Sequence, residues 1–98
     1  MSVGAQGVVS VAANLIPRQV TKMVHAHLKG DLKGSLKLHQ KYYPLFRNLF
    51  IETNPTPVKA ALAMMGLVKE EYRLPLVRME SNSRRQLRAT LKSVGVLK

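Results

Sequence analysis

Apolar residues along the chain follow first the pattern of a buried strand and then that of amphipathic helices. Val8, Val9 and Val11 form a nearly continuous β-branched run, which is typical of a parallel strand buried on both faces. Pro17 suits the first turn of a helix, and apolar residues then recur at helical spacing until Gly30. The pattern therefore predicts one short strand followed closely by one helix.

A longer apolar row predicts a second helix. Asp31 stands just before the row and is suited to cap the helix N-terminus. Pro44 lies inside the row and removes one backbone hydrogen bond, so we expect a kink there. We expect the row to lie in the core or at a subunit interface rather than in a ligand groove. Its members are Leu32, Leu36, His39, Tyr43, Phe46 and Phe50.

Two shorter helices complete the pattern. Prolines on either side of Thr56 force extended backbone before them, so Thr56 should cap a helix over residues 58–65 that Gly66 ends. An extended connection follows. The last helix should begin at Ser81 or Ser83 and run nearly to the C-terminus.

Composition narrows the class of protein. The 98 residues fit one small domain with a limited core. The chain has no cysteine, which excludes disulfides and thiolate metal sites. The apolar run near the N-terminus makes a poor signal peptide, and no stretch approaches the roughly 20 apolar residues that span a bilayer. A cytoplasmic protein with no membrane partner is therefore expected.

The charge leaves an alternative function open. Lys and Arg total 16 against five acids, giving +11, an excess that raises nucleic acid or an anionic surface as a partner. The basic residues also fit the solvated sides of amphipathic helices, and no aromatic residues interleave with them for base stacking. A stand-alone basic helical module is the alternative hypothesis. The two basic rows are Lys29, Lys33, Lys37 and Lys41, and Arg84, Arg85, Arg88 and Lys92.

Histidines and one lysine are the candidates for metal or Schiff-base chemistry. His25 and His27 point to nearly opposite sides of a helix, and no acid or cysteine joins them or His39 at ligand spacing. We therefore expect no metal site. Lys59 lies in the first turn of a helix, which favours a snorkelling surface lysine over a desolvated nucleophile.

Glu70 and Glu71 are the one pair of adjacent acids in the chain. Paired-acid catalysis needs two carboxylates that face each other across a cleft. These two follow a helix end directly, so we expect them to form a solvated corner.

Two segments in this order resemble a known family. The first reads Gly-Val-Val-Ser-Val over residues 7–11, followed by Ala13 and Asn14, and the second reads Leu-Phe-Ile-Glu-Thr-Asn-Pro-Thr-Pro-Val-Lys over residues 49–59. They resemble the last barrel strand and the C-terminal appendix of dihydrodipicolinate synthases, which are pyruvate-dependent lyases of the class I aldolase superfamily. Ala12 and Tyr72 depart from the usual family residues, so a related pyruvate-dependent aldolase is a second alternative.

This resemblance implies a mainly α chain in two parts. Residues 1–30 would be the last β/α unit of a (β/α)8 TIM barrel, and residues 31–98 a three-helix C-terminal domain. A lone parallel strand leaves its amides and carbonyls unpaired, so we expect the other strands to lie upstream. The chain is thus expected to be a fragment of a TIM-barrel enzyme.

The resemblance also implies an enzymatic function for the full-length protein, and no activity for this chain by itself. The family condenses pyruvate with aspartate semialdehyde in lysine biosynthesis, through a lysine Schiff base, and its catalytic lysine and tyrosine lie on earlier strands. The chain is thus an enzyme segment by family, with no catalytic residue and no cofactor, and inactive alone. Val9 would contact pyruvate in the full-length enzyme. The implied partners are the remainder of the barrel or further copies in a homo-oligomer, and neither nucleic acid nor membrane.

Overall fold

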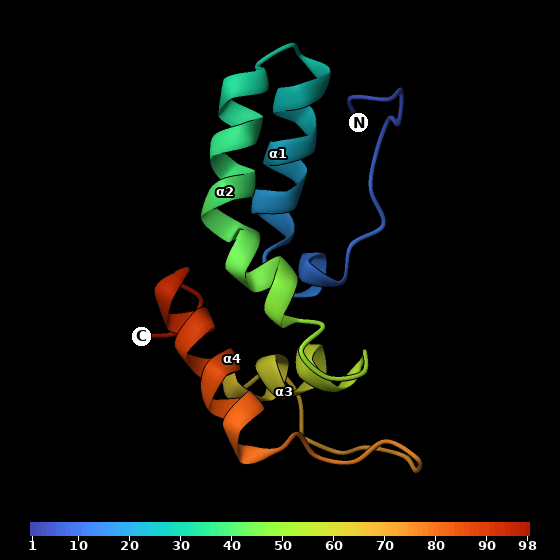
Figure 1. Cartoon of the computed structure of the whole chain (residues 1–98), viewed down its shortest axis with the longest axis vertical. Coiled ribbons are helices and arrows are strands. Elements are labelled where there is room, and N and C mark those ends of the chain that lie inside the picture. The colour runs from blue at the N-terminus through green and yellow to red at the C-terminus, as the bar shows by residue number, and fades with distance from the viewer.

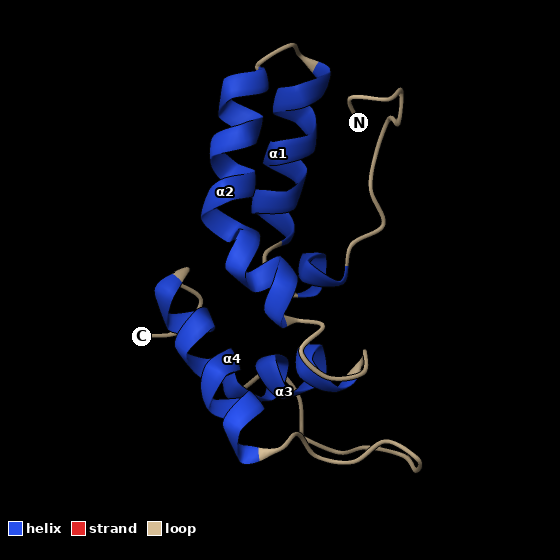
Figure 2. Ribbon diagram, in the orientation of Figure 1, coloured by secondary structure: helices blue, strands red, loops and turns tan.

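The computed structural model describes residues 1–98 and contains helices but no strand (Figure 2). A short 3-10 helix, η1 (Val11–Asn14), precedes four α-helices. These are α1 (Pro17–Leu28), α2 (Leu32–Asn48), α3 (Thr56–Met64) and α4 (Ser81–Ser93). The mainly α class is therefore confirmed.

The predicted strand over residues 7–11 is wrong for this chain. Ser10 has an extended backbone, but residues 7–10 carry no regular structure, and Val11 already belongs to η1. A strand exists only when a neighbour pairs with its amides and carbonyls, and no extended segment of the chain makes backbone hydrogen bonds with residues 7–10. Val8 and Val9 are consequently exposed. The valines of residues 7–11 therefore favour a β-sheet, but this segment is not part of a sheet in the structure.

Helix ends follow the local sequence closely. Gly30 ends the first hairpin arm with φ +84°, a left-handed conformation that glycine adopts without strain. The Asp31 carboxylate then accepts a hydrogen bond from the amide of Gly34 at 2.9 Å, which caps α2 as predicted. The cap predicted at Thr56 is wrong, because α3 begins at Thr56 itself and Pro55 precedes it without a side-chain cap.

The helices form two layers that α2 connects (Figure 1). α1 and α2 run antiparallel as a hairpin, and α3 and α4 pack together at the other end of the molecule, which measures 42 × 28 × 21 Å. α2 contacts both α1 and α4, and η1 contacts α1 and α3. Pro44 lies within α2, and the lower part of this helix leans away from the axis of its upper part, as the predicted kink requires (Figure 1).

The core takes a different row of α2 from the one predicted. We call the row that packs into the core the inner row; it consists of the partly buried Leu38 and the buried Tyr42, Leu45 and Leu49, the last at the C-cap of α2. We call the predicted row the outer row; of its six residues, Leu32, Leu36, His39, Tyr43 and Phe50 are exposed and Phe46 is half-buried. The inner and outer rows differ by one position in the sequence, which is about 100° around a helix. The prediction that the outer row forms the core of this chain is therefore wrong, and its placement at an interface stays a prediction.

Both layers contribute to one continuous core. The fully buried side chains of Leu45 and Leu49 on α2 belong to the same cluster as Leu87 and Leu91 on α4. Beside them, the buried amide of Asn48 donates a hydrogen bond to the hydroxyl of Thr90 at 2.7 Å. This bond satisfies a buried polar group, so it joins α2 to α4 and offsets the cost of removing the amide from water.

Candidate functional site

The predicted substrate contact lies on the segment before η1. Val9 is fully exposed, and Ala12 behind it is buried against the core. The Asn14 side chain donates to the carbonyl of Val11 at 3.0 Å, and the amide of Ala13 donates to the carbonyl of Ser10 at 3.2 Å. Local hydrogen bonds therefore hold η1 in place, while the backbone around Val9 remains open to a partner.

Val8 and Val9 form one wall of a groove of about 310 Å³. The opposite wall comes from α1 and α2, including Phe46 and Phe50 of the outer row. His39 also lines the groove, and its ring lies 5.8 Å from those of both Tyr43 and Phe46. The groove is thus mostly apolar, and it joins the N-terminal segment to the outer row.

The groove lacks the groups that a Schiff-base reaction needs. Its only titratable lining residue is His39, and no lysine, tyrosine or carboxylate side chain lines it. A Schiff base requires an amine nucleophile beside the bound carbonyl compound. The residues around Val9 can therefore shape a binding surface but cannot form this covalent bond.

The three histidines do not converge on one point. His27 and His39 line a shallow groove between α1 and α2, whereas His25 lies on the outward side of α1. No group of three or more His, Cys, Asp or Glu side chains is arranged to hold a metal ion.

Lys59 is held by the backbone of the connection between α3 and α4. Its ammonium donates to the carbonyl of Glu71 at 2.9 Å and lies 5.7 Å from the ring centre of Tyr72. The Lys59 ammonium therefore contacts the backbone and an aromatic ring of the same chain, a setting that suits a lysine packed along the protein surface.

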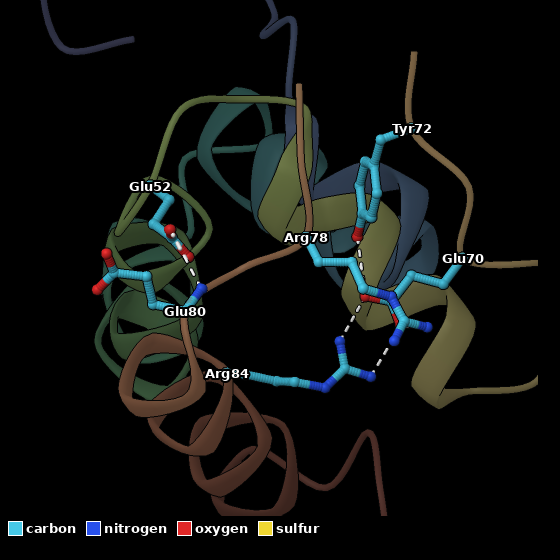
Figure 3. A network of polar contacts seen from close by, with 6 residues as sticks. All are labelled: Glu52, Glu70, Tyr72, Arg78, Glu80 and Arg84. Atoms are coloured by element: carbon cyan, nitrogen blue, oxygen red, sulfur yellow. Dashed lines mark hydrogen bonds and ion pairs between the residues drawn. The ribbon is translucent and has the colours of Figure 1, made fainter. Parts of the chain in front are cut away.

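Glu70 is the centre of a polar cluster that the sequence does not reveal (Figure 3). Its side chain is only 8% exposed, so the expectation of a solvated corner is wrong for Glu70, although Glu71 is exposed. Arg84 of α4 donates to both carboxylate oxygens, at 2.5 and 2.8 Å, and the Tyr72 hydroxyl donates at 3.1 Å. Arg78 lies 3.8 Å away. Fourteen positions separate Glu70 from Arg84, so no local pattern could have paired them.

The cluster changes the ionisation of its members. The hydrogen bonds from Arg84 favour the charged carboxylate and hold the pKa of Glu70 below its usual value, against the opposing effect of burial. Burial and the hydrogen bond to Glu70 together raise the pKa of Tyr72 to about 12. At neutral pH the carboxylate is therefore charged and the phenol remains a donor.

Most basic side chains have no acidic neighbour. Arg78 and Arg84 are the only ones within 4.0 Å of a carboxylate, and both contact Glu70. The predicted row Lys29, Lys33, Lys37 and Lys41 lies exposed along α2 and the turn before it. In the hairpin this basic row and the outer row occupy different sides of α2. None of the helices is both long and apolar enough to pass through a membrane.

Comparison with known proteins shows which family this chain resembles. A sequence profile described as the dihydrodipicolinate synthetase family matches residues 1–94. The 4-hydroxy-tetrahydrodipicolinate synthase of Thermodesulfovibrio yellowstonii is 46% identical over 98 residues, which are 100% of this chain and 34% of that protein. The synthase of Aquifex aeolicus is 46% identical over 96 residues, or 98% of this chain and 33% of that protein. The chain thus spans about a third of the length of these relatives.

Solved structures agree with the sequence comparison. A crystal structure of dihydrodipicolinate synthase from Thermotoga maritima superposes with a TM-score of 0.95 at 43% identity, covering 98% of this chain and 32% of that one. The synthase of Methylacidiphilum fumariolicum SolV gives 0.94 at 53% identity, covering 95% and 31%. The fold of this chain is therefore that of one part of the dihydrodipicolinate synthase structures. More particularly, the chain belongs to the dihydrodipicolinate synthetase family, which confirms the resemblance found in the sequence.

Proposed function

We propose that this chain is the C-terminal segment of a 4-hydroxy-tetrahydrodipicolinate synthase, and that it is inactive by itself. The complete enzyme would condense pyruvate with aspartate semialdehyde in the cytoplasm, as a step of lysine biosynthesis. The observation that carries the proposal is the match of the whole chain to one third of each relative. The absence of an amine nucleophile from the groove beside Val9 supports the proposed inactivity.

The proposed enzyme would use groups from the rest of the barrel for chemistry. Its catalytic lysine amine would attack the keto carbon of pyruvate and release water to give a Schiff base. Residues 1–30 would complete the barrel as its last β/α unit, and residues 31–98 would form the C-terminal helical domain. In that setting residues 7–11 would gain a neighbouring strand and pair as the valine run predicts.

Val9 is proposed to contact pyruvate through its backbone. Active sites of β/α barrels lie at the C-terminal ends of the strands, and Val9 is near the end of the proposed last strand. Its exposure leaves the backbone free for a substrate. A backbone contact tolerates a change between valine and isoleucine, because both side chains have the same branched shape at Cβ.

The proposed partners are the remainder of the barrel and, in the assembled enzyme, further copies. The outer row and Val8 expose apolar surface along one side of the molecule. Contiguous apolar surface of this kind marks a site of protein contact. Without the remainder of the barrel, we expect this surface to drive self-association.

A chimera tests the proposed function. This chain would replace the matching third of the Thermodesulfovibrio yellowstonii synthase, and the chimera, the chain alone and the intact relative would be assayed for condensation of pyruvate with aspartate semialdehyde. We expect turnover by the chimera and none by the chain alone. Borohydride with pyruvate should trap a Schiff base on the chimera only. Turnover by the isolated chain would refute its proposed inactivity.

The intact relative is the positive control for every step. If the chimera is folded and oligomerises like the relative but neither traps pyruvate nor turns over, the proposed role of this chain is wrong. In the active chimera, Val9→Ile should leave the KM for pyruvate within about twofold, because the backbone is unchanged. Val9→Pro should raise it, because proline alters the backbone at the proposed contact.

A second candidate function is binding of a polyanion by the exposed basic rows. The lysines of α2 have no acidic partner, which favours this function over a neutral surface. A binder that neutralises phosphates loses affinity steeply as salt rises. Titration of the chain with a random DNA duplex across a salt series checks this. Absence of binding at low salt would end this candidate.

A further inference from the structure

The connection between α3 and α4 is weakly attached to the rest of the molecule. We call residues 66–80 the strap. Residues 68–79 make only two backbone hydrogen bonds, from Glu71 to Lys69 and from Leu76 to Arg73, and both stay within the strap. Figure 2 shows this connection as an irregular loop that projects from the α3 and α4 layer. Backbone with few hydrogen bonds to other elements is where proteins open locally at low cost.

Few contacts hold the strap down, and the strongest is at Glu70. Arg84 binds the Glu70 carboxylate through two hydrogen bonds, a geometry that is both strong and directional. By contrast, the amide of Glu80 donates to Glu52 at a long 3.4 Å, and Lys59 donates a single bond to the Glu71 carbonyl. Met79 is the one strap residue that belongs to the buried hydrophobic core.

We propose that the strap opens as a unit and that the Glu70–Arg84 ion pair is the clasp that holds it closed. When the clasp is broken, the strap moves away from α4 and takes the Tyr72 ring away from Lys59 of α3, over which it now lies. The helices stay folded, because Met79 is the only strap residue among the buried residues of the core cluster. The clasp is thus a conformational device in the proposed helical domain.

The groups around Glu70 set the direction of its response to pH. Arg84, Arg78 and the Tyr72 hydroxyl face the carboxylate, and the Lys59 ammonium lies over the Tyr72 ring. The pKa of Glu70 is lowered in the folded chain from its usual 4.5, chiefly by the Arg84 hydrogen bonds. The clasp is therefore fully closed above that value and is lost as the pH falls through the lowered pKa. Acid should open the strap.

Matched substitutions and proteolysis test the clasp. Trypsin can cut the strap after Arg73, which is exposed, and can cut α4 after Arg88. Glu70→Gln should increase the rate of cutting at Arg73 by about tenfold and leave Arg88 unchanged, since cutting follows the population of the open form. Glu71→Gln removes an exposed neighbouring charge and should change neither rate.

Spin labels give a second readout that does not depend on the protease. The chain has no native cysteine, so Leu74→Cys and Arg88→Cys can be labelled selectively. We expect a narrow distance distribution in the parent and a broad one after Glu70→Gln, after Arg84→Gln, or at pH 3. Arg85→Gln is the control for Arg84→Gln, because Arg85 contacts only Asn82 of its own helix.

Each result of these experiments either supports the clasp or contradicts it. A Glu70→Gln variant with unchanged helical circular dichroism and an unchanged distance distribution would overturn the clasp. A Glu70→Gln variant that loses its helices together with the strap would overturn the claim that the strap opens as a unit. The exchange Glu70→Arg with Arg84→Glu should restore the narrow distribution and the slow cutting at Arg73. Failure of the exchange to restore either one would also count against the ion pair.

Discussion

The inner and outer rows of α2 are both largely apolar, but the inner row packs into the core whereas most of the outer row is exposed. Leu45 of the inner row is 0% exposed, whereas Leu36 of the outer row is 55% exposed. Both rows repeat at helical spacing, so each has the pattern of a core-facing stripe. The chain has enough neighbouring helices to cover one row only. A helix with two apolar faces thus leaves one of them exposed in this chain, and such a face is typical of a site of protein contact.

The largest difference between the rows should appear on truncation to alanine. Leu45→Ala should lower the free energy of unfolding by about 3 kcal/mol, because it removes buried surface and leaves a cavity. Leu36→Ala, the matched change on the outer row, should stay within about 0.5 kcal/mol of the parent. Urea denaturation followed by circular dichroism measures both. Equal losses from the two variants would contradict the assignment of the rows.

The hydrogen bond beside the inner row should show the next largest effect. Thr90→Val keeps the shape of the side chain but leaves the buried amide of Asn48 without its acceptor. We expect a loss of about 2 kcal/mol in the same urea experiment. Thr90→Ser retains the hydroxyl and should recover most of that loss. A Thr90→Val variant as stable as the parent would show that the hydrogen bond from Asn48 contributes little to stability.

The outer row should be needed for association and not for stability. Tyr43→Lys places a charge in its middle, and self-association measured by sedimentation equilibrium should weaken about tenfold, or about 1.4 kcal/mol. Measurement at moderate salt reduces repulsion between chains that each carry +11. Gln40→Lys adds the same charge to α2 outside the outer row and is the control. A monomeric parent would show that the outer row does not drive self-association.

Removal of the N-terminal cap of α2 should cause the smallest loss of stability. The cap stabilises the whole helix, so the loss does not distinguish the inner row from the outer row. Asp31→Ala removes the hydrogen bond to the amide of Gly34 and should cost about 1 kcal/mol. Asp31→Asn retains an acceptor at the cap and should cost much less. Urea midpoints of the three proteins provide the measurement. An Asn variant as unstable as the Ala variant would mean that the charge of Asp31, and not its cap, matters.

Local chemistry made the helix ends predictable. Pro17, Gly30 and Asp31 act on the backbone within a few residues of themselves, so their effects can be deduced from the sequence. The choice between the rows of α2 could not be deduced in this way. Shifting the row by one residue gives an equally apolar stripe, and only the positions of α1 and α4 decide which stripe is buried.

In the candidate site, too, features set by nearby residues could be predicted and features set by distant residues could not. Val9 could be placed beside a barrel centre only by the family resemblance, because its exposure in this chain gives no chemical indication of a role. The contact between Glu70 and Arg84 depends on the path of the whole strap, so the sequence around Glu70 could suggest only a solvated corner. Residues whose role depends on distant partners are those that the sequence did not predict.

Asn48 has a consequence for how the two layers align. Leucines alone would let α4 slide along α2 by one helical turn, about 5.4 Å, and still bury a leucine at each position. Such a slide would carry Thr90 away and leave the Asn48 amide facing hydrocarbon, with the penalty of an unmade buried hydrogen bond. The Asn48–Thr90 hydrogen bond therefore fixes the register of the two helices. It selects one position of α4 along α2, where a purely apolar interface would allow several.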